Sequence, residues 1–175
     1  MYVRFLLNRA AVIVDRKERV TTRPKLEKIR KTKTKMFHKN GWTAIVLASQ
    51  GGHLDCIKYL VGEGGADVSA ADKYGTTAVI RASENGHLEY IKYLVNERGA
   101  DVNAANKDGK TAVMFASQGE HLECIKYLVD EGGADVNAAD KDGSTAVILA
   151  SRGGHLEVVA YLTSQGAALP SISSV

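Results

Sequence analysis

The sequence predicts an all-α solenoid of four stacked helix–turn–helix units. The main observation is that one glycine and one histidine recur along the chain at a constant spacing. Both series step by 34 residues, at Gly41, Gly75, Gly109 and Gly143 and at His53, His87, His121 and His155. A period of this length is typical of supersecondary units that can bury their apolar faces only against neighbouring units.

The second unit, residues 72–105, shows how its first helix is specified. Thr77 precedes the apolar run that begins at Ala78, and its hydroxyl can accept a hydrogen bond from an amide of the first helical turn. A short helix is therefore expected to begin at Ala78. Gly86 suits the left-handed conformation that commonly ends a helix, so this helix has only about seven residues.

A second helix is expected from Leu88 to the turn at Gly99. Leu88, Ile91 and Leu94 form one apolar stripe, and polar side chains occupy the other positions. The following segment, residues 100–111, is polar and contains the turn sequence Lys-Asp-Gly. Each unit is thus predicted to be a helix, a turn, a second helix and a protruding hairpin-like loop.

The residues shared by the four units resemble the ankyrin repeat. The shared pattern reads GxTAxxxASxxGHLExIKYLVxExGADVNAA and covers residues 38 to about 169. The resemblance implies an ankyrin-repeat solenoid with β-hairpin-like loops. The chain departs from the family in having TAIV, TAVI, TAVM and TAVI where Thr-Pro-Leu-His is usual, so packing is expected to replace a polar network at Val46, Ile80, Met114 and Ile148.

The repeats divide the chain into three parts. Residues 1–37 form a basic N-terminal extension, residues 38–169 the repeat domain and residues 170–175 a C-terminal tail. The expected repeats are 38–71, 72–105, 106–139 and 140–169. The extension holds twelve Lys or Arg and three acidic residues, a balance of +9, whereas the remainder has a balance of −6.

The function of the extension is open between several interpretations. Residues 1–14 fit a helix that caps the solenoid, a weakly ordered extension or a mitochondrial presequence, and a secretory signal fits less well because no small-residue cleavage site follows. Residues 16–35 fit a solvated tail, a nuclear address, or an arm that binds nucleic acid or anionic lipid. Base stacking has no aromatic platform there.

By resemblance, a partner protein is expected to contact the loop residues beside the turn glycine and the ends of the first helices, on the concave ankyrin surface. Trp42, the only tryptophan, is either a binding anchor or a cover for the first repeat. The loop lysines are either a site for an acidic partner or a solvated row. The candidates are Lys39, Asn40, Trp42, Gln50, Lys73, Tyr74, Thr76, Glu84, Lys107, Asp108, Lys110, Gln118, Lys141, Asp142, Ser144 and Arg152.

No catalytic, cofactor or metal site is predicted. The four histidines would be stacked on the order of 10 Å apart, whereas the ligands of one zinc ion all lie about 2 Å from it, so they are interpreted as structural. No nucleophile paired with a base and no phosphate-binding glycine loop is present. Cys56 and Cys124 are too far apart for a disulfide and are expected to be buried apolar residues.

One residue and the end of the fourth repeat depart from the repeated pattern. Glu120 replaces the corner glycine, and Gly119 is expected to end the helix in its place, which would spare Glu120 a left-handed backbone. The fourth repeat is more polar at its end but keeps Ile148, Val158 and Val159. Either residues 169–175 cover this face or the chain is a fragment of a longer array.

The predicted function is a non-catalytic module that binds another protein. One alternative is that the basic arm binds nucleic acid or anionic membrane and the repeats act as a spacer; another is a regulatory fragment of a larger protein. An intracellular location, cytoplasmic or nuclear, is expected because the cysteines are unpaired. A membrane-spanning segment and a cofactor are not expected.

Overall fold

The computed structural model describes residues 43–52, 54–62 and 64–169. Within these residues the chain is helical and contains no β-strand, as predicted for an all-α fold. The predictions for residues 1–37, for Lys39, Asn40 and Trp42, and for residues 170–175 lie outside this part. The helices are α3 (Ala44–Gln50), α4 (Leu54–Gly62), α5 (Ala78–Glu84), α6 (Leu88–Lys92), α7 (Ala112–Gln118), α8 (Leu122–Asp130), α9 (Ala146–Gly153) and α10 (Leu156–Ser164), with a π-helix η1 (Tyr93–Glu97) continuing α6.

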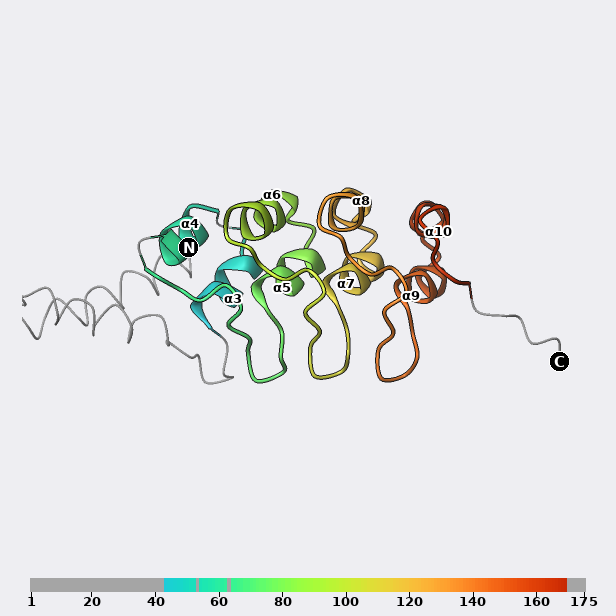
Figure 1. The fold of residues 1–175 in the computed structure, drawn as a ribbon, viewed down its shortest axis with the longest axis horizontal. Coiled ribbons are helices and arrows are strands. Elements are labelled where there is room, and N and C mark those ends of the chain that lie inside the picture. The colour runs from blue at the N-terminus through green and yellow to red at the C-terminus, as the bar shows by residue number, and fades with distance from the viewer. Residues whose placement is uncertain (1–42, 53, 63, 170–175) are drawn as a thin grey trace, which may run out of the picture.

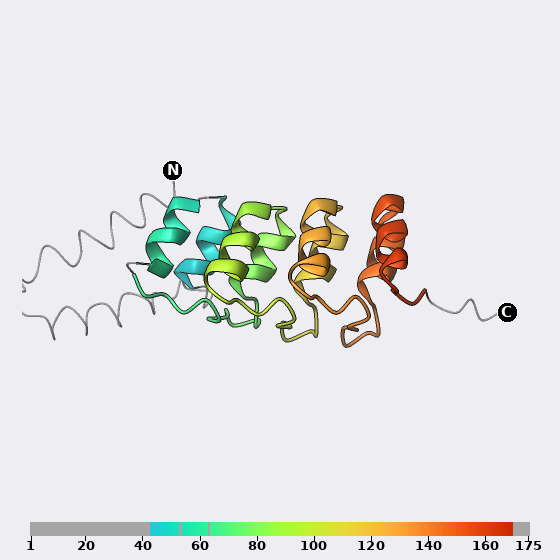
Figure 2. The ribbon, with the colours of Figure 1, turned by 45° about the horizontal axis from the view of Figure 1, so that its top comes forward.

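The helices form two parallel rows (Figure 1). The first helices of the repeats, α3, α5, α7 and α9, make one row, and α4, α6, α8 and α10 make the other. Each first helix contacts the next one along the row, and the loops project from the edge beside the first helices. The same order of repeats is visible when the solenoid is turned by 45° (Figure 2). The predicted stacking of helix–turn–helix units is therefore confirmed.

Threonine precedes every first helix, as predicted. The Thr77 hydroxyl accepts a hydrogen bond from the Ile80 amide at 3.4 Å, and the Thr43 hydroxyl accepts one from the Val46 amide at 3.3 Å. Thr111 and Thr145 have the same extended backbone, but their hydroxyls make no capping bond. The helix starts are thus confirmed in all four repeats, and the capping bond forms in two of them.

The prediction for Glu120 is wrong. Glu120 has φ 58°, in the left-handed region, whereas Gly119 has φ −90°. The cause is the turn that closes each first helix, in which the amide of the corner histidine donates to a carbonyl five residues earlier. This bond is 3.0 Å long from His121 to Ala116 and 2.9 Å long from His87 to Ala82. The same closure therefore holds residue 120 in the conformation that Gly86 adopts in the second repeat, with φ 69°.

The π-helix at the end of α6 was not predicted, and it accompanies a substitution. In repeats 1 and 3 a glycine follows the second helix, and the Gly132 amide donates to the Tyr127 carbonyl at 2.9 Å. A Cβ atom on Gly132 would lie 2.7 Å from the Leu128 carbonyl oxygen, so only glycine fits this turn. Repeat 2 has Arg98 at the equivalent position, and there the helix widens into a π-turn instead.

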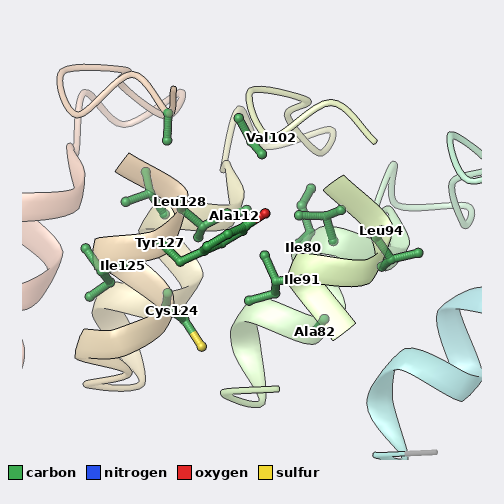
Figure 3. Close-up of a cluster of buried hydrophobic side chains, with 14 of the residues drawn as sticks. Ile80, Ala82, Ile91, Leu94, Val102, Ala112, Cys124, Ile125, Tyr127 and Leu128 are labelled. Carbon is green, nitrogen blue, oxygen red and sulfur yellow. The ribbon is translucent and has the colours of Figure 1, made fainter. Parts of the chain in front are cut away.

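The core runs continuously between the two rows of helices. Figure 3 shows Ile91 and Leu94 of the second repeat and Ile125 and Leu128 of the third, all of them fully buried. Val46, Ile80 and Met114 are also buried, as expected for packing in place of the usual polar network, whereas Ile148 in the last repeat is half-buried. Close packing of this kind supplies most of the stabilisation of a repeat array.

The two cysteines differ in burial. Cys124 is 2% exposed, and burial raises the pKa of its thiol to about 11. Cys56 is only half-buried, so the expectation that both cysteines are buried is wrong for Cys56. Both are free thiols.

Asparagines connect the turns that follow the second helices. The Asn103 side chain donates to the Gly133 carbonyl at 3.1 Å and accepts from the Asp135 amide at 2.9 Å. Asn137 makes the same pair of bonds to Gly166 and Ala168. Ser69 occupies this position in the first repeat, and its hydroxyl instead donates to Asp67 in its own turn at 2.6 Å.

Candidate functional site

The loops and the exposed ends of the first helices form one surface, here called the loop face. The shape of each loop is set by a side chain at its base. In the fourth repeat the carboxylate of Asp140 accepts hydrogen bonds from the amides of Asp142 and Ser144, at 3.0 and 2.8 Å. Asp72 makes the same bonds to Tyr74 and Thr76 in the second repeat, and Asn106 does so in the third. These bonds hold the loops in a common conformation.

Successive loops are joined through their main chains. The Lys107 amide donates to the Tyr74 carbonyl at 2.8 Å, and the Lys141 amide donates to the Asp108 carbonyl at 2.9 Å. Gly75 permits this contact, because it has φ 79° and a Cβ atom there would lie 2.9 Å from the Lys107 nitrogen. The loops therefore form a connected ribbon.

The corner histidines bridge neighbouring repeats at the C-terminal ends of the first helices. His121 Nε2 lies 3.1 Å from the Glu84 carbonyl oxygen, and His155 Nε2 lies 3.2 Å from the Gln118 carbonyl oxygen. His87 Nε2 lies 3.4 Å from the Gln50 carbonyl oxygen. These contacts fit the structural role predicted for them; His53 lies outside the described residues.

An open depression of about 360 Å³ lies on the loop face between repeats 3 and 4. It is bounded by residues from two loops and two first helices, namely Lys110, Gln118, Asp140, Asp142, Ser144, Leu149, Arg152 and Gly153. The guanidinium of Arg152 donates to the Ser144 hydroxyl at 3.0 Å, which fixes that side chain at the edge. Leu149, which is 8% exposed, adds a small apolar surface beside the exposed charged groups of Asp142 and Arg152.

A charged cluster occupies the corresponding part of repeat 2. Arg81 lies 3.7 Å from the carboxylate of Asp72 and also pairs with Glu84. Arg81 and Phe115 take the position of Leu47 and Leu149 in the other repeats, and all except Leu149 are half-buried. The floor of the loop face therefore changes along the array from apolar to charged and back to apolar.

The structure places most of the predicted contact residues on the loop face. Five of them, Lys110, Gln118, Asp142, Ser144 and Arg152, come together around the depression. Lys73 and Tyr74 lie at a loop tip, where the ammonium group sits 4.7 Å from the ring centroid. The exposed candidates are Gln50, Lys73, Tyr74, Lys107, Asp108, Gln118, Lys141, Asp142 and Arg152, and Glu84 and Lys110 are half-buried.

Two predicted contact residues are unsuited to that role. Thr76 is 4% exposed and Ser144 is 2% exposed. Both donate a backbone amide to the buried carboxylate at the base of their loop. They shape the loop and present almost no surface to a partner, so we correct their assignment.

Three residues at the depression were not predicted as contacts, namely Asp140, Leu149 and Gly153. A signal for Asp140 was available, because an acidic or amide residue three positions before the turn glycine is typical of a side chain that caps a turn. The one sequence signal for Leu149 is that its position varies between repeats, with Arg81 in repeat 2 and Phe115 in repeat 3. Its position at the edge of the core follows from helix packing, which the sequence does not specify at that level.

Within 43–52, 54–62 and 64–169, no three His, Cys, Asp or Glu side chains are close enough together to hold a metal ion. In the same part of the chain, none of the helices has the length and apolar character needed to cross a bilayer.

Comparison with known protein families gives one match, which covers most of the chain. A family model described as "Ankyrin repeats (3 copies)" matches residues 24–106 and again residues 98–172. No curated protein matched the chain. The family match covers well over half of the sequence and agrees with the repeated helix pairs and projecting loops. The protein therefore belongs to the ankyrin repeat family.

Proposed function

We propose that this protein is a non-catalytic binding module that holds a partner protein on its loop face. Ankyrin repeats generally mediate protein–protein interaction. The observation that carries the proposal here is the depression between repeats 3 and 4, because four exposed or half-buried residues predicted as contacts, Lys110, Gln118, Asp142 and Arg152, surround it. The joined loops make this surface rigid, so little conformational entropy would be lost on binding.

The composition of the depression favours a peptide segment with both an apolar and a charged side chain. Leu149 would contact the apolar group, and Arg152 and Asp142 would contact charged groups. Arg152 is already held by the Ser144 hydroxyl, so its guanidinium is oriented before a partner arrives. A partner that uses these groups would lose affinity when either charge is removed.

The test compares two double variants of the full chain in a nuclease-treated capture experiment from extract of the source cell, with bound proteins quantified by mass spectrometry. Lys110→Ala/Arg152→Ala changes the depression. Lys92→Ala/Lys126→Ala removes the same charge from the row of second helices, where both lysines form exposed ion pairs with neighbouring glutamates. We expect a discrete protein to be lost about tenfold or more in the first variant and kept in the second, as for hot-spot residues.

The outcomes separate the alternatives. Equal capture by the two variants would contradict the loop-face proposal. Capture that disappears at high salt, or that occurs only when the nuclease is left out, would instead favour binding through the basic residues 16–35. The salt dependence is therefore measured in parallel at low and high ionic strength.

A further inference from the structure

The first repeat has an open face toward the N-terminus, consisting of Ala44, Cys56 and Tyr59. Tyr59 is 54% exposed, whereas the equivalent residues Tyr93 and Tyr127 are 5% and 4% exposed. In repeats 2 and 3 the tyrosine at this position is therefore covered by neighbouring residues. In the first repeat no described residue covers it.

The other two residues of the open face show the same asymmetry. Ala44 and Cys56 are half-buried. Their equivalents in the later repeats are all buried, namely Ala78, Ala112 and Ala146 for the alanine and Tyr90, Cys124 and Val158 for the cysteine. The exposure is thus a property of the position of the first repeat in the array and does not depend on residue type.

Contacts in the later repeats show what normally covers this face. The Tyr127 hydroxyl donates to the Asn96 side chain of the preceding repeat at 2.7 Å, and the Tyr161 hydroxyl donates to the Asp130 side chain of its preceding repeat at 2.8 Å. Lys58 of the first repeat lies 5.8 Å from the centroid of the Tyr93 ring. Each tyrosine is therefore covered by the second helix of the preceding repeat, and Tyr59 requires an equivalent cover.

The chain that precedes Thr43 is attached directly beside the open face. Thr43 caps α3, whose first residue, Ala44, belongs to the open face, so the preceding segment begins beside that face. The family match begins at residue 24, well before the first complete repeat. Within the matched segment Leu26 and Ile29 are three residues apart, a spacing that places two side chains on one face of a helix.

We propose that residues 24–42 pack against the open face of the first repeat, with Leu26 and Ile29 covering Tyr59 and Cys56. The segment would cover the face that a preceding repeat covers in the later repeats. Charge favours the contact, because the segment contains seven Lys or Arg and one Glu, whereas residues 43–175 contain ten Lys or Arg and seventeen Asp or Glu. Residues 24–42 belong to the same molecule as the open face, so their effective concentration there is high. This favours them over a second molecule as the cover.

The proposal changes the interpretation of the basic arm. Leu26 and Ile29 belong to the same stretch, residues 16–35, that sequence analysis offers as a tail or a nucleic-acid arm. If they serve the repeat array, part of that stretch has a structural role. The inference stands apart from the loop face and does not depend on which partner the protein binds.

The two native cysteines provide a direct test in the full chain. Cys56 lies on the open face, and Cys124 is buried in the third repeat with its thiol pKa raised to about 11. Native protein is treated with N-ethylmaleimide, and the labelling of each cysteine is followed by peptide mass spectrometry. We expect Cys56 to be labelled about tenfold or more slowly in the native chain than in Leu26→Ser/Ile29→Ser, because a covered thiol reacts only when its cover opens.

Two controls keep the result specific. Cys124 reports global folding, and its labelling is expected to stay slow in every variant. Thr32→Ser/Thr34→Ser changes two residues of the same segment without removing apolar groups, and it is expected to leave Cys56 protected. Equal labelling of Cys56 in the native chain and in Leu26→Ser/Ile29→Ser would overturn the proposal. Protection that grows with protein concentration would also overturn it, because that result assigns the cover to a second copy.

A second measurement keeps the test decisive if the double variant unfolds. In Ile29→Cys, a short bis-maleimide is expected to join residues 29 and 56 within one molecule. Monomeric cross-linked product at low protein concentration supports the proposal. Cross-linked dimer alone, or no product that contains both residues, contradicts it.

Discussion

The guanidinium Nε of Arg98 donates a hydrogen bond to the Tyr93 hydroxyl at 2.9 Å, and its charge lies 5.3 Å from the ring centroid. This bond substitutes for one that the preceding repeat does not supply. The tyrosines of repeats 3 and 4 bond to Asn96 and Asp130, but repeat 1 has Gly62 at that position. Arg98 also ends a π-helix at a place where repeats 1 and 3 have a tight glycine turn. Two departures from the repeat thus compensate one another.

Arg98→Gly is expected to lower the free energy of unfolding by about 1 kcal/mol, because the Tyr93 hydroxyl loses its partner. Adding Gly62→Asn should recover part of this loss by recreating the bond that Asn96 makes to Tyr127. Urea unfolding followed by circular dichroism gives both values. Gly62→Ala in the same background is the matched control, since it raises helix propensity without supplying an acceptor. Equal recovery with alanine would refute the hydrogen-bond explanation.

Glu120→Gly is expected to raise the free energy of unfolding by about 1 kcal/mol, since it relieves a left-handed backbone at a non-glycine residue. The substitution also removes the carboxylate that lies 3.4 Å from His155 Nδ1, but this glutamate is mostly exposed and the pair contributes little. Thermal unfolding is the measurement. Glu123→Gly, in the first turn of α8 where Glu123 pairs with Lys126, is the control and should destabilise the protein instead. A destabilised Glu120→Gly variant would mean that the ion pair outweighs the strain.

Ser69→Asn should strengthen the junction between repeats 1 and 2 by about 1 kcal/mol, because the asparagine can reproduce the two bonds that Asn103 and Asn137 make to the following turn. Hydrogen exchange of the amides in α3 and α4 is the measurement, since protection there reports local opening of the first repeat. Asn103→Ser is the reciprocal variant and is expected to reduce protection at the next junction. Unchanged exchange in both variants would show that these bonds do not hold the repeats together.

Tyr161→Phe should make stability less dependent on alkaline pH. Burial raises the pKa of Tyr161, and its bond to the Asp130 carboxylate raises it further. A raised folded-state pKa contributes stability that is fully present below the ordinary tyrosine pKa of about 10 and is lost as pH rises above it. The native chain should therefore lose stability more steeply than Tyr161→Phe above about pH 10. Tyr74→Phe, on an exposed loop tip, is the control and should retain the native pH dependence.

The repeated features of the fold could be predicted from the sequence, and the features peculiar to one repeat could not. A period of 34 residues predicts the order of helices because each helix start is marked by a threonine and each corner by a histidine. The left-handed Glu120 was missed because its conformation is imposed by the bond from the His121 amide to the Ala116 carbonyl. Glycine propensity alone favours a left-handed Gly119, but the hydrogen bond that closes the turn requires this conformation at residue 120.

The candidate site shows the same division. The loop positions follow from the repeat, so Lys110, Asp142 and Arg152 could be predicted near the site. The burial of Thr76 and Ser144 could not, because it depends on how far each loop folds back onto its buried Asp72 or Asp140. Adjacent positions in a loop can point in opposite directions, and the sequence pattern does not state which one faces outward.

The bonds from Lys107 to Tyr74 and from Lys141 to Asp108 have a consequence for how this surface can change. Because only backbone atoms make them, the spacing of the loop tips is independent of the side chains that the tips carry. Tyr74, Asp108 and Asp142 are equivalent positions with different chemistry on this constant spacing. New specificities could therefore be introduced by exchanging tip residues one at a time, without redesigning the scaffold that presents them.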